Sequence, residues 1–312
     1  MKASHWIEQA AKAMDEAGLH FGHGTDNPGD EAAWLLLHVI GAPLDGSFQD
    51  WSLELDPVQR QQADQLLADR IGKGIPLAYI LGRAFFAGLE FAVNEQVLVP
   101  RSPIAELVLE RFSPWVDATA VHEVLDLCTG SGCIGIAVAT YLPWVNVDAT
   151  DISSRALELA RGNVHRHGVE SRVRLLQSDL FSALGGRRYD LIVTNPPYIP
   201  LPAIAGLPDE YRAEPEIGLV SGEDGLEASL QILLQAADYL REGGILLCEV
   251  GESEQRLAQR LPGVPFTWLE FQHGGSGVFL LGRDDLQNIR PAVGRAIAAG
   301  RQAAGDLICT RP

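Results

Sequence analysis

The sequence predicts an α/β protein whose core is a mostly parallel, Rossmann-like sheet with helices on both faces, preceded by a small helical domain. Three features predict this architecture. After residue 123, short apolar strands alternate with helical segments, an order typical of parallel sheets. A glycine-rich turn joins the first of these strands to a helix, as in doubly wound nucleotide-binding folds. Before residue 84, apolar side chains recur at helical spacing instead.

The first 83 residues predict a bundle of three amphipathic helices, spanning residues 5–19, 30–40 and 57–71. Asp26-Asn27-Pro28 and Asp56-Pro57 precede the second and third helices, and a polar cap followed by proline is a helix start signal. Such a bundle fits a substrate-recognition domain and a structural cap on the main domain equally well.

A strand-like pattern follows, with Phe85-Phe86 and Leu89 to Val93 on either side of Gly88, and predicts a hairpin that joins two domains. The segment after Gly282 is rich in alanine, arginine and glycine, which predicts a frayed helical tail without an assigned function. The expected parts are a helical domain at 1–83, a hairpin linker at 84–99, the main domain at 100–283 and a tail at 284–312.

The main domain continues the alternation of strands and helices beyond the glycine turn. Its last two strands are joined by His273-Gly-Gly-Ser276 and predict a hairpin that adds one antiparallel strand. The first expected strand begins at residue 123 and leads into the glycine turn. The other expected strands are 145–150, 172–177, 189–194, 244–250, 266–271 and 277–281, and the expected helices are 153–167, 226–241 and 253–261.

Composition indicates a soluble, cytoplasmic protein. The chain has 312 residues, 46% of them hydrophobic, which is enough for a large core and two domains. Its start has no apolar run of signal-peptide length, and no stretch of about 18 uncharged apolar residues occurs, so we expect no membrane association. We interpret Cys128 and Cys133, which flank the glycine turn, as small packing residues rather than metal ligands.

The chain is strongly acidic, with 24 basic and 41 acidic residues and a formal charge of −17. A nucleic-acid enzyme needs a basic track that meets phosphates, and none is visible, so we expect no direct nucleic-acid binding. An acidic surface suits a basic protein partner by electrostatic steering, although an acidic surface kept for solubility would have the same composition.

The glycine turn reads Gly130-x-Gly132-x-x-Gly135, and Asp151 follows Gly130 by 21 residues, about where an acid that binds a ribose is expected. Asp126 lies inside the apolar strand, and a buried carboxylate needs a partner. An ammonium group would supply this partner, and S-adenosylmethionine carries both an ammonium group and a ribose. The alternative is that Asp126 only accepts hydrogen bonds from backbone N–H groups of a turn.

Asp179 and Leu180 lie just past the strand expected at 172–177, at the edge of the sheet where the ligand is expected. We therefore expect both residues beside the adenine, with Asp179 accepting a hydrogen bond from the exocyclic amine. A plain turn cap is the alternative for Asp179. The candidate cofactor-binding residues are Asp126, Gly130, Gly132, Asp151, Asp179, Leu180 and Asn195.

Asn195-Pro196-Pro197-Tyr198 follows the strand expected at 189–194 and should face the glycine turn. Two prolines restrict the backbone, so the Asn195 side-chain oxygen and the Pro196 carbonyl become two fixed acceptors for an –NH2 group. Such acceptors orient the weakly nucleophilic nitrogen of an amide or aromatic amine and stabilise the positive charge that develops on it. Tyr198 offers a flat surface to a planar substrate. The candidate catalytic residues are Asn195, Pro196 and Tyr198, and all four residues are expected to bind the substrate.

The aspartate and glycine turn together with this tetrapeptide resemble the class I, S-adenosylmethionine-dependent amino-methyltransferases, which modify adenine in nucleic acid or glutamine in proteins. Three further segments resemble the glutamine branch, the HemK/PrmC/PrmB protein-glutamine N5-methyltransferase family. They are Pro100-Arg101, Glu214-Pro215 and Gly222-Glu-Asp-Gly225-Leu226. The resemblance covers roughly residues 20 to 282 and implies a seven-stranded methyltransferase sheet.

Within this family, the chain is most similar to the PrmB branch, whose members methylate a glutamine of the third large-subunit ribosomal protein, L3. Three segments carry this likeness: His23-Gly-Thr-Asp26-Asn27-Pro28, Pro100-Arg-Ser-Pro-Ile104 and Trp268-Leu-Glu-Phe271. The members that act on release factors have threonine and glutamate where this chain has Ile104 and Ala105. The resemblance therefore implies a basic ribosomal protein as partner, with Arg101 either lining the cofactor entrance or pairing with a carboxylate.

Two other functions remain compatible with these residues. An adenine-N6 methyltransferase uses the same tetrapeptide on a flipped base, and a silent ribosome-assembly factor would bind without turnover. The loop between Pro200 and Gly225 bears on this choice because it contains a single basic residue, Arg212. We expect its acids to contact basic residues beside the target glutamine. They are Asp209, Glu210, Glu214, Glu216, Glu223 and Asp224.

Overall fold

The structure, a computed structural model, describes the backbone of residues 1–309 and the side chains of residues 1–300 and 302. The chain divides into two compact units. Unit 1 comprises Met1–Phe85, Glu90–Arg101 and Leu207–Pro215, and unit 2 comprises Phe86–Leu89, Ser102–Gly206 and Glu216–Pro312. Unit 1 therefore contains a short segment, 207–215, that the sequence analysis assigned to the main domain.

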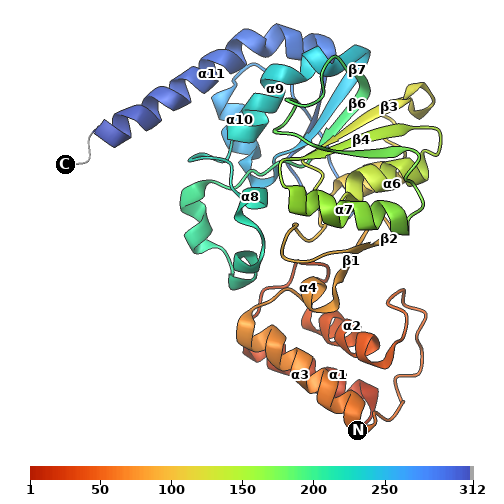
Figure 1. The fold of residues 1–312 in the computed structure, drawn as a ribbon. Coiled ribbons are helices and arrows are strands. Elements are labelled where there is room, and N and C mark those ends of the chain that lie inside the picture. The colour runs from red at the N-terminus through yellow and green to blue at the C-terminus, as the bar shows by residue number, and fades with distance from the viewer. Residues whose placement is uncertain (310–312) are drawn as a thin grey trace. The chain divides into compact units, whose positions relative to one another are not determined.

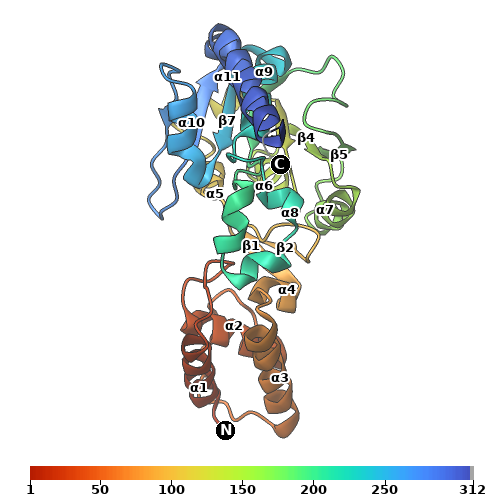
Figure 2. The ribbon, with the colours of Figure 1, turned by 90° about the vertical axis from the view of Figure 1, so that its left-hand side faces the viewer.

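Unit 1 is a helical bundle in which α2 packs against both α1 and α3 (Figure 2). Trp6 and Met14 of α1 and Leu35 and Leu36 of α2 are fully or almost fully buried in its core. The indole N–H of Trp6 donates to Asp64 on α3 at 2.7 Å, which links the first helix to the third. The helices are α1 (Ala3–Glu16), α2 (Pro28–Ile40), α3 (Pro57–Lys73) and α4 (Leu77–Leu81).

The three long helices confirm the expected bundle, and their start signals act as predicted. The Asn27 side chain accepts from the Asp30 N–H, and Pro28 is the first residue of α2. Asp56 accepts from the N–H groups of Val58 and Gln59, and the Gln59 side chain returns a hydrogen bond to the Asp56 N–H, which completes a capping box. The sequence does not predict α4, because five residues are too few to show a helical period.

The expected hairpin is present as β1 (Arg83–Phe86) and β2 (Leu89–Ala92), which form a two-stranded sheet. Its two-residue connection has φ values of 48° at Ala87 and 74° at Gly88. Positive φ at both loop residues matches the right-handed twist of the two strands, which is why glycine is favoured there.

Unit 2 contains a seven-stranded sheet in the order β5-β4-β3-β6-β7-β9-β8 (Figure 1). The pairs among β5, β4, β3, β6 and β7 are parallel, and β9 is antiparallel to both β7 and β8. One reversed strand in an otherwise parallel sheet is what the sequence predicts. The strands are β3 (Glu123–Leu127), β4 (Asn146–Asp151), β5 (Val173–Gln177), β6 (Tyr189–Thr194), β7 (Leu240–Glu249), β8 (Thr267–Trp268) and β9 (Val278–Gly282).

Helices cover both faces of this sheet (Figure 1). Successive side chains of β3 point to opposite faces. Asp126 contacts α6, whereas Leu125 and Leu127 belong to the core cluster that contains residues of α9 and α10. The helices are α5 (Ile104–Leu109), α6 (Cys133–Tyr141), α7 (Ser154–Arg166), α8 (Glu216–Leu219), α9 (Glu227–Tyr239), α10 (Glu254–Arg260) and α11 (Arg283–Cys309), and the 3-10 helices are Ala118–Ala120, Leu201–Gly206, Asp209–Ala213 and Gly251–Ser253.

The segment interpreted as a frayed tail begins as an integral helix. Leu286, Ile289, Val293 and Ala296 recur at helical spacing, are buried, and belong to the same core cluster as α9 and β7. The structure therefore extends the packed core well beyond residue 283, and residues 310–312 of the expected tail lie outside the described residues. Within the described residues, no helix is both long enough and apolar enough to span a membrane.

We predict that Leu286→Ala lowers the free energy of unfolding by about 2–5 kcal/mol, because it leaves a cavity in the core beneath α11. Urea denaturation followed by circular dichroism measures the change. Gln287→Ala is the control, since Gln287 is the next residue on the same helix and is exposed. Equal stability of the two variants would show that α11 is not part of the cooperative core.

Candidate active site

The predicted site residues follow four strands that are neighbours in the sheet. Leu127 of β3 lies opposite Thr150 of β4 and Thr194 of β6, and Asp151 lies opposite Gln177 of β5. Because all four strands are parallel, their carboxyl ends form one edge of the sheet. This edge carries Asp179 and Leu180 after β5, Asp151 at the end of β4, Asp126 with the glycine turn at β3, and Asn195 to Tyr198 after β6.

Asp126 is fully buried, and its two carboxylate oxygens differ. Oδ2 accepts from the Thr129 hydroxyl at 2.5 Å and from the Gly135 N–H at 2.8 Å. Oδ1 has no hydrogen-bond partner among the described residues. Burial raises the pKa of Asp126 to about 7, although these two hydrogen bonds act in the opposite direction. Backbone capping therefore accounts for one oxygen, and the other is suited to a cationic group.

Glycine is required at the three positions of the turn for different structural reasons. A Cβ on Gly130, where φ is 56°, would meet nothing within 4 Å, so this position is open to a ligand. A Cβ on Gly132 would lie 3.0 Å from the Ile136 side chain and 3.3 Å from the Ala160 Cβ. A Cβ on Gly135 would lie 2.9 Å from Asp126 Oδ2. Gly132 and Gly135 thus allow close packing, which the sequence motif alone does not reveal.

Asp151 connects the glycine turn to β4. Its Oδ2 accepts from the Gly130 N–H at 2.9 Å and its Oδ1 from the Ser153 N–H at 2.8 Å, while burial raises its pKa. The next residue, Ile152, has a side chain that is 47% exposed at the site edge, and the sequence analysis did not select it. The sequence feature that could have identified Ile152 is its position as an aliphatic residue directly after Asp151, the acid at the end of the strand.

Two non-glycine residues at this edge have left-handed backbone conformations. Cys128, directly after β3, has φ of 63°, and Leu180, after β5, has φ of 45°. Such conformations are costly for residues with a Cβ and concentrate at functional sites. Asp179 beside Leu180 is exposed, and its backbone carbonyl accepts from the Ser182 N–H.

The tetrapeptide after β6 begins beside the glycine turn. The Thr194 hydroxyl donates to the Leu127 carbonyl at 2.7 Å, which ties the end of β6 to the end of β3. Pro196 is buried, whereas Asn195 and Tyr198 are partly exposed. The Tyr198 carbonyl accepts from the Ser253 hydroxyl at 2.6 Å, so the tetrapeptide is held from both sides.

The chain after Tyr198 enters unit 1 at segment 207–215, where Arg70 lies at the centre of a buried ion cluster. The Arg70 side chain is 2% exposed and contacts Glu31 at 2.6 Å and Glu210 at 3.0 Å. It also donates to the His20 carbonyl at 3.0 Å, and the His20 N–H donates to Glu210 at 2.9 Å. For Glu31, burial raises the pKa more than Arg70 lowers it. For Glu210, burial opposes ionisation, but hydrogen bonds from its own backbone, Arg70 and His20 outweigh it and lower the pKa.

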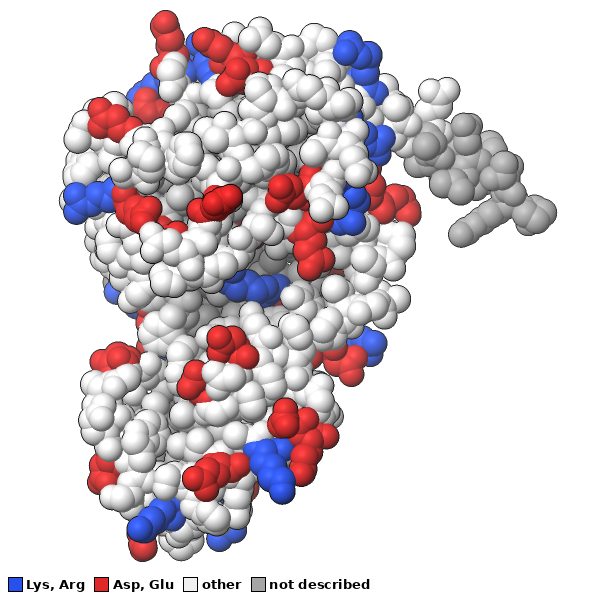
Figure 3. All heavy atoms as spheres, turned by 180° about the vertical axis from the view of Figure 1, so that it is seen from behind, with Lys and Arg blue, Asp and Glu red and all other residues white. Residues whose placement is uncertain are grey.

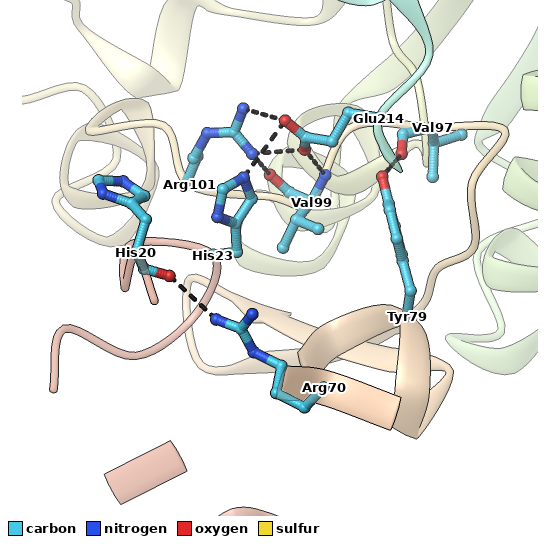
Figure 4. Close-up of polar contacts among 8 residues, drawn as sticks. All are labelled: His20, His23, Arg70, Tyr79, Val97, Val99, Arg101 and Glu214. Carbon is cyan, nitrogen blue, oxygen red and sulfur yellow. Dashed lines mark hydrogen bonds and ion pairs between the residues drawn. The ribbon is translucent and has the colours of Figure 1, made fainter. Parts of the chain in front are cut away.

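Glu214 forms a second buried cluster in unit 1 (Figure 4). Arg101 donates to both of its carboxylate oxygens at 2.6 Å, and the Val99 N–H donates to it at 2.9 Å. His23 Nε2 lies 3.4 Å from Glu214 Oε2. Burial opposes ionisation of Glu214, but His23 and Arg101 overcome it and lower its pKa to about 2. Of the two roles considered for Arg101, the structure supports pairing with a carboxylate.

These pairs correct one expectation from the sequence. Glu210 and Glu214 were expected to contact a basic substrate, but both are buried and paired with arginines of their own chain. Two other acids of the loop also have partners, since Asp209 pairs with Arg212 and Asp224 with Arg260. The partners of the buried glutamates lie 140 and 113 residues away in the sequence, so no local pattern reveals them.

Comparison with known proteins decides the family. Residues 5–82 match the PrmC N-terminal domain, and residues 105–201 match the methyltransferase small domain. The chain is 48% identical over 273 residues to a ribosomal protein uL3 glutamine methyltransferase of Xanthomonas campestris pv. campestris, which covers 88% of each chain. The chain belongs to the uL3 glutamine methyltransferase family.

The chain is similar to other proteins as well. A ribosomal protein uL3 glutamine methyltransferase of Neisseria meningitidis serogroup A is 45% identical over 278 residues, covering 89% of this chain and 91% of its own. Among solved structures, a methyltransferase from Pyrococcus furiosus has a TM-score of 0.46 and 21% identity, covering 72% of this chain and 98% of that one. As a member of the uL3 glutamine methyltransferase family, the protein is a methyltransferase that uses S-adenosylmethionine.

The site residues fit this cofactor. The cofactor has an ammonium group, and Asp126 has a buried carboxylate oxygen without a partner among the described residues. Its nucleoside needs close approach to the backbone, and Gly130 leaves open space where a side chain would lie. Its adenine needs an apolar surface, and Ile152 is exposed next to Asp151.

We predict that Arg70→Met destabilises the helical bundle by about 3–5 kcal/mol, because it leaves Glu31 and Glu210 buried without their cation. Hydrogen exchange of the α3 backbone amides measures this local stability. Arg60→Met is the matched control on the same helix, since Arg60 is 52% exposed in its pair with Asp64 and should cost no more than about 1 kcal/mol. Similar protection in both variants would contradict the prediction.

Proposed function

We propose that the protein transfers a methyl group from S-adenosylmethionine to the side-chain amide nitrogen of a glutamine in ribosomal protein uL3. The observation that carries the proposal is the position of Asn195-Pro196-Pro197-Tyr198 beside the glycine turn of β3, in a chain 48% identical to an enzyme named for this activity. Asp126, the carboxylate proposed for the cofactor, is then on β3, and the acceptors proposed for the substrate, Asn195 and Pro196, follow the neighbouring strand β6.

The proposed cofactor contacts follow from the geometry of the sheet edge. Asp126 Oδ1 accepts from the ammonium group, and Asp151, whose oxygens each already accept one N–H, uses its remaining lone pairs for the ribose hydroxyls. Ile152 and Leu180 contact the adenine, and Asp179 accepts from its amine. The bound cofactor supplies an electrophilic methyl group on a sulfonium. Gly130 and Gly132 form the turn over which the adenosine lies.

Asn195 and Pro196 are proposed to bind the substrate amide. The Asn195 side-chain oxygen and the Pro196 carbonyl accept the two N–H hydrogens of the glutamine –NH2 group, which directs the nitrogen lone pair toward the methyl group. As the nitrogen–carbon bond forms, the carbon–sulfur bond to the sulfonium breaks and leaves a neutral thioether. The same two oxygens stabilise the positive charge on nitrogen, and the surplus proton then leaves to water. Pro197 restricts the backbone, and Tyr198 contacts the flat face of the amide.

The loop after the tetrapeptide favours a protein substrate over a nucleic acid. Its only basic residue, Arg212, is paired with Asp209, whereas Leu201 and Ile217 are 45% and 57% exposed. Acidic and basic side chains are intermingled on the face of the molecule in Figure 3. These features support apolar and acidic contacts with a basic protein, rather than phosphate binding. We accordingly propose a cytoplasmic enzyme that meets uL3 without contacting nucleic acid or membrane.

The direct test is incubation of the enzyme with radiolabelled S-adenosylmethionine and, in separate reactions, uL3, a release factor or RNA purified from cells lacking the enzyme. Peptide mass spectrometry then locates the label in any labelled protein. Label on a glutamine of uL3 is the expected result. Label on a release factor or on RNA, with none on uL3, would overturn the proposed substrate.

We predict that Asn195→Ala lowers kcat for uL3 about 100- to 1000-fold, because one of two oriented acceptors is lost. The dissociation constant of S-adenosylhomocysteine, which has the cofactor's nucleoside and amino acid parts, should change less than tenfold. Calorimetry and the radiolabel assay measure the two quantities. Asn146→Ala is the control, since Asn146 is exposed at the amino end of β4 and its loss should leave kcat unchanged.

A second prediction concerns pH. Because burial raises the pKa of Asp126 to about 7, the carboxylate becomes charged as the pH rises through that value. The dissociation constant of S-adenosylhomocysteine should therefore fall roughly tenfold between about pH 5.5 and 7.0. Asp126→Asn should bind more weakly and lose this dependence, as calorimetry at several pH values would reveal. A wild-type affinity that does not vary over this range would contradict the role of Asp126.

The same shift has a consequence for stability without ligand. The folded pKa of Asp126 lies above the ordinary value of 3.8, so the folded state binds more protons than the unfolded state between these values. Stability contributed by the protonated carboxyl is thus present below about pH 4 and is lost as the pH rises toward 7.

A further inference from the structure

A buried polar chain in unit 2 connects Tyr198 to Ser102 through Glu249. Glu249 is the last residue of β7 and is 4% exposed. The Tyr198 hydroxyl lies 3.5 Å from Glu249 Oε1, within hydrogen-bond distance, and the Ser102 hydroxyl donates to Glu249 Oε2. Ser102 Oγ in turn accepts from the Ile104 N–H at 3.1 Å. Each carboxylate oxygen of Glu249 is therefore directed at a different segment.

The ring of Tyr198 is confined by close backbone packing on its other sides. A Cβ on Gly251 would lie 2.7 Å from Cε2 and Cζ of the ring, so only glycine allows the ring its position. A Cβ on Gly225 would lie 2.3 Å from the Tyr198 carbonyl oxygen. That oxygen accepts from Ser253, whose hydroxyl also accepts from Arg256 at 2.9 Å. Residues from two segments far apart in the sequence thus converge on one tyrosine.

We infer that Glu249 is a positioning residue that fixes the distal end of the Tyr198 ring for methyl transfer. The inference rests on the proposed function, in which Tyr198 contacts the flat face of the glutamine amide. The tyrosine hydroxyl lies on the Cβ–Cγ axis, so a hydrogen bond to it does not stop rotation about that bond. It does oppose a change of rotamer about the Cα–Cβ bond, which would carry the whole ring away. The backbone of Gly251 packs against the ring at Cε2 and Cζ, and Glu249 holds the hydroxyl. Ser102 keeps the carboxylate itself in one orientation, so that the hydroxyl meets a fixed acceptor.

A purely structural role for Glu249 predicts different behaviour. If Glu249 only stabilises the fold, its neutralisation would lower the free energy of unfolding and would affect both cofactor binding and kcat. A carboxylate that acts through Tyr198 would lower kcat alone, and its effect would vanish once the Tyr198 hydroxyl is absent, because the two residues act as one unit.

The test is a double-mutant cycle with Glu249→Gln and Tyr198→Phe, measured on uL3 and by S-adenosylhomocysteine binding. Each single variant is expected to lower kcat about tenfold, since a hydrogen bond to a charged group is lost. The double variant should also lose about tenfold rather than a hundredfold. The dissociation constant of S-adenosylhomocysteine should stay within about twofold. Asp190→Asn is the matched control, because Asp190 is a partly buried carboxylate at the amino end of β6 that binds Arg241 and two backbone N–H groups, and its kcat should be unchanged.

Unchanged kcat in Glu249→Gln, or a double variant with a hundredfold loss, would overturn the inference. If Glu249→Gln does not fold, Gly251→Ala replaces it, since its methyl group must displace the ring; normal kcat in that variant would overturn the inference as well. Wild-type protein that methylates a different acceptor would overturn the proposed substrate alone, and the same cycle on that acceptor would then test Glu249.

Discussion

The register of β3 with its two parallel neighbours is the constraint on which the candidate site depends. Leu127 lies opposite Thr150 and Thr194, so the chain leaves β3, β4 and β6 at the same level of the sheet. A parallel strand cannot shift by one residue without turning its buried side chains to the wrong face. The apolar pattern of these strands therefore also determines where Asp126, Asp151 and Asn195 lie. Core packing and the position of the site are consequences of the same pairing.

Four buried carboxylates are stabilised against the free-energy cost of desolvation in different ways. Glu210 and Glu214 are each paired with an arginine, and their pKa values are lowered in spite of burial. Glu249 receives the Ser102 hydroxyl and faces that of Tyr198. Asp126 has only a hydroxyl and a backbone N–H on one oxygen, and its pKa is raised. Of the four, Asp126 has a buried oxygen without a partner among the described residues, which is why we propose that it binds the cofactor.

The loop that follows the tetrapeptide is divided between the two units, which its sequence does not predict. Its ends belong to unit 2, where Ile199 bridges Val220, while its middle belongs to unit 1 through Glu210 and Glu214. The acids of this loop predicted a surface for basic substrates. Two of them, Glu210 and Glu214, instead attach the loop to the helical bundle. The loop still presents the exposed acids Glu216 and Glu223, together with the exposed apolar residues Leu201 and Ile217.

The sequence alone determined the fold class, the helix starts at Asn27 and Asp56, the hairpin, and the chemical identity of Asp126 and Asn195-Pro196-Pro197-Tyr198. These features depend on local patterns: apolar period, cap residues, and polar residues at the ends of strands. The tertiary structure alone decided which acids are buried, that the helix after residue 283 belongs to the core, and that Ile152 and Glu249 lie near the candidate site. Each of these features depends on contacts between segments far apart in the chain. Burial sets the free-energy cost of a charge and the free energy gained by an apolar surface, and it exists only once those segments have packed.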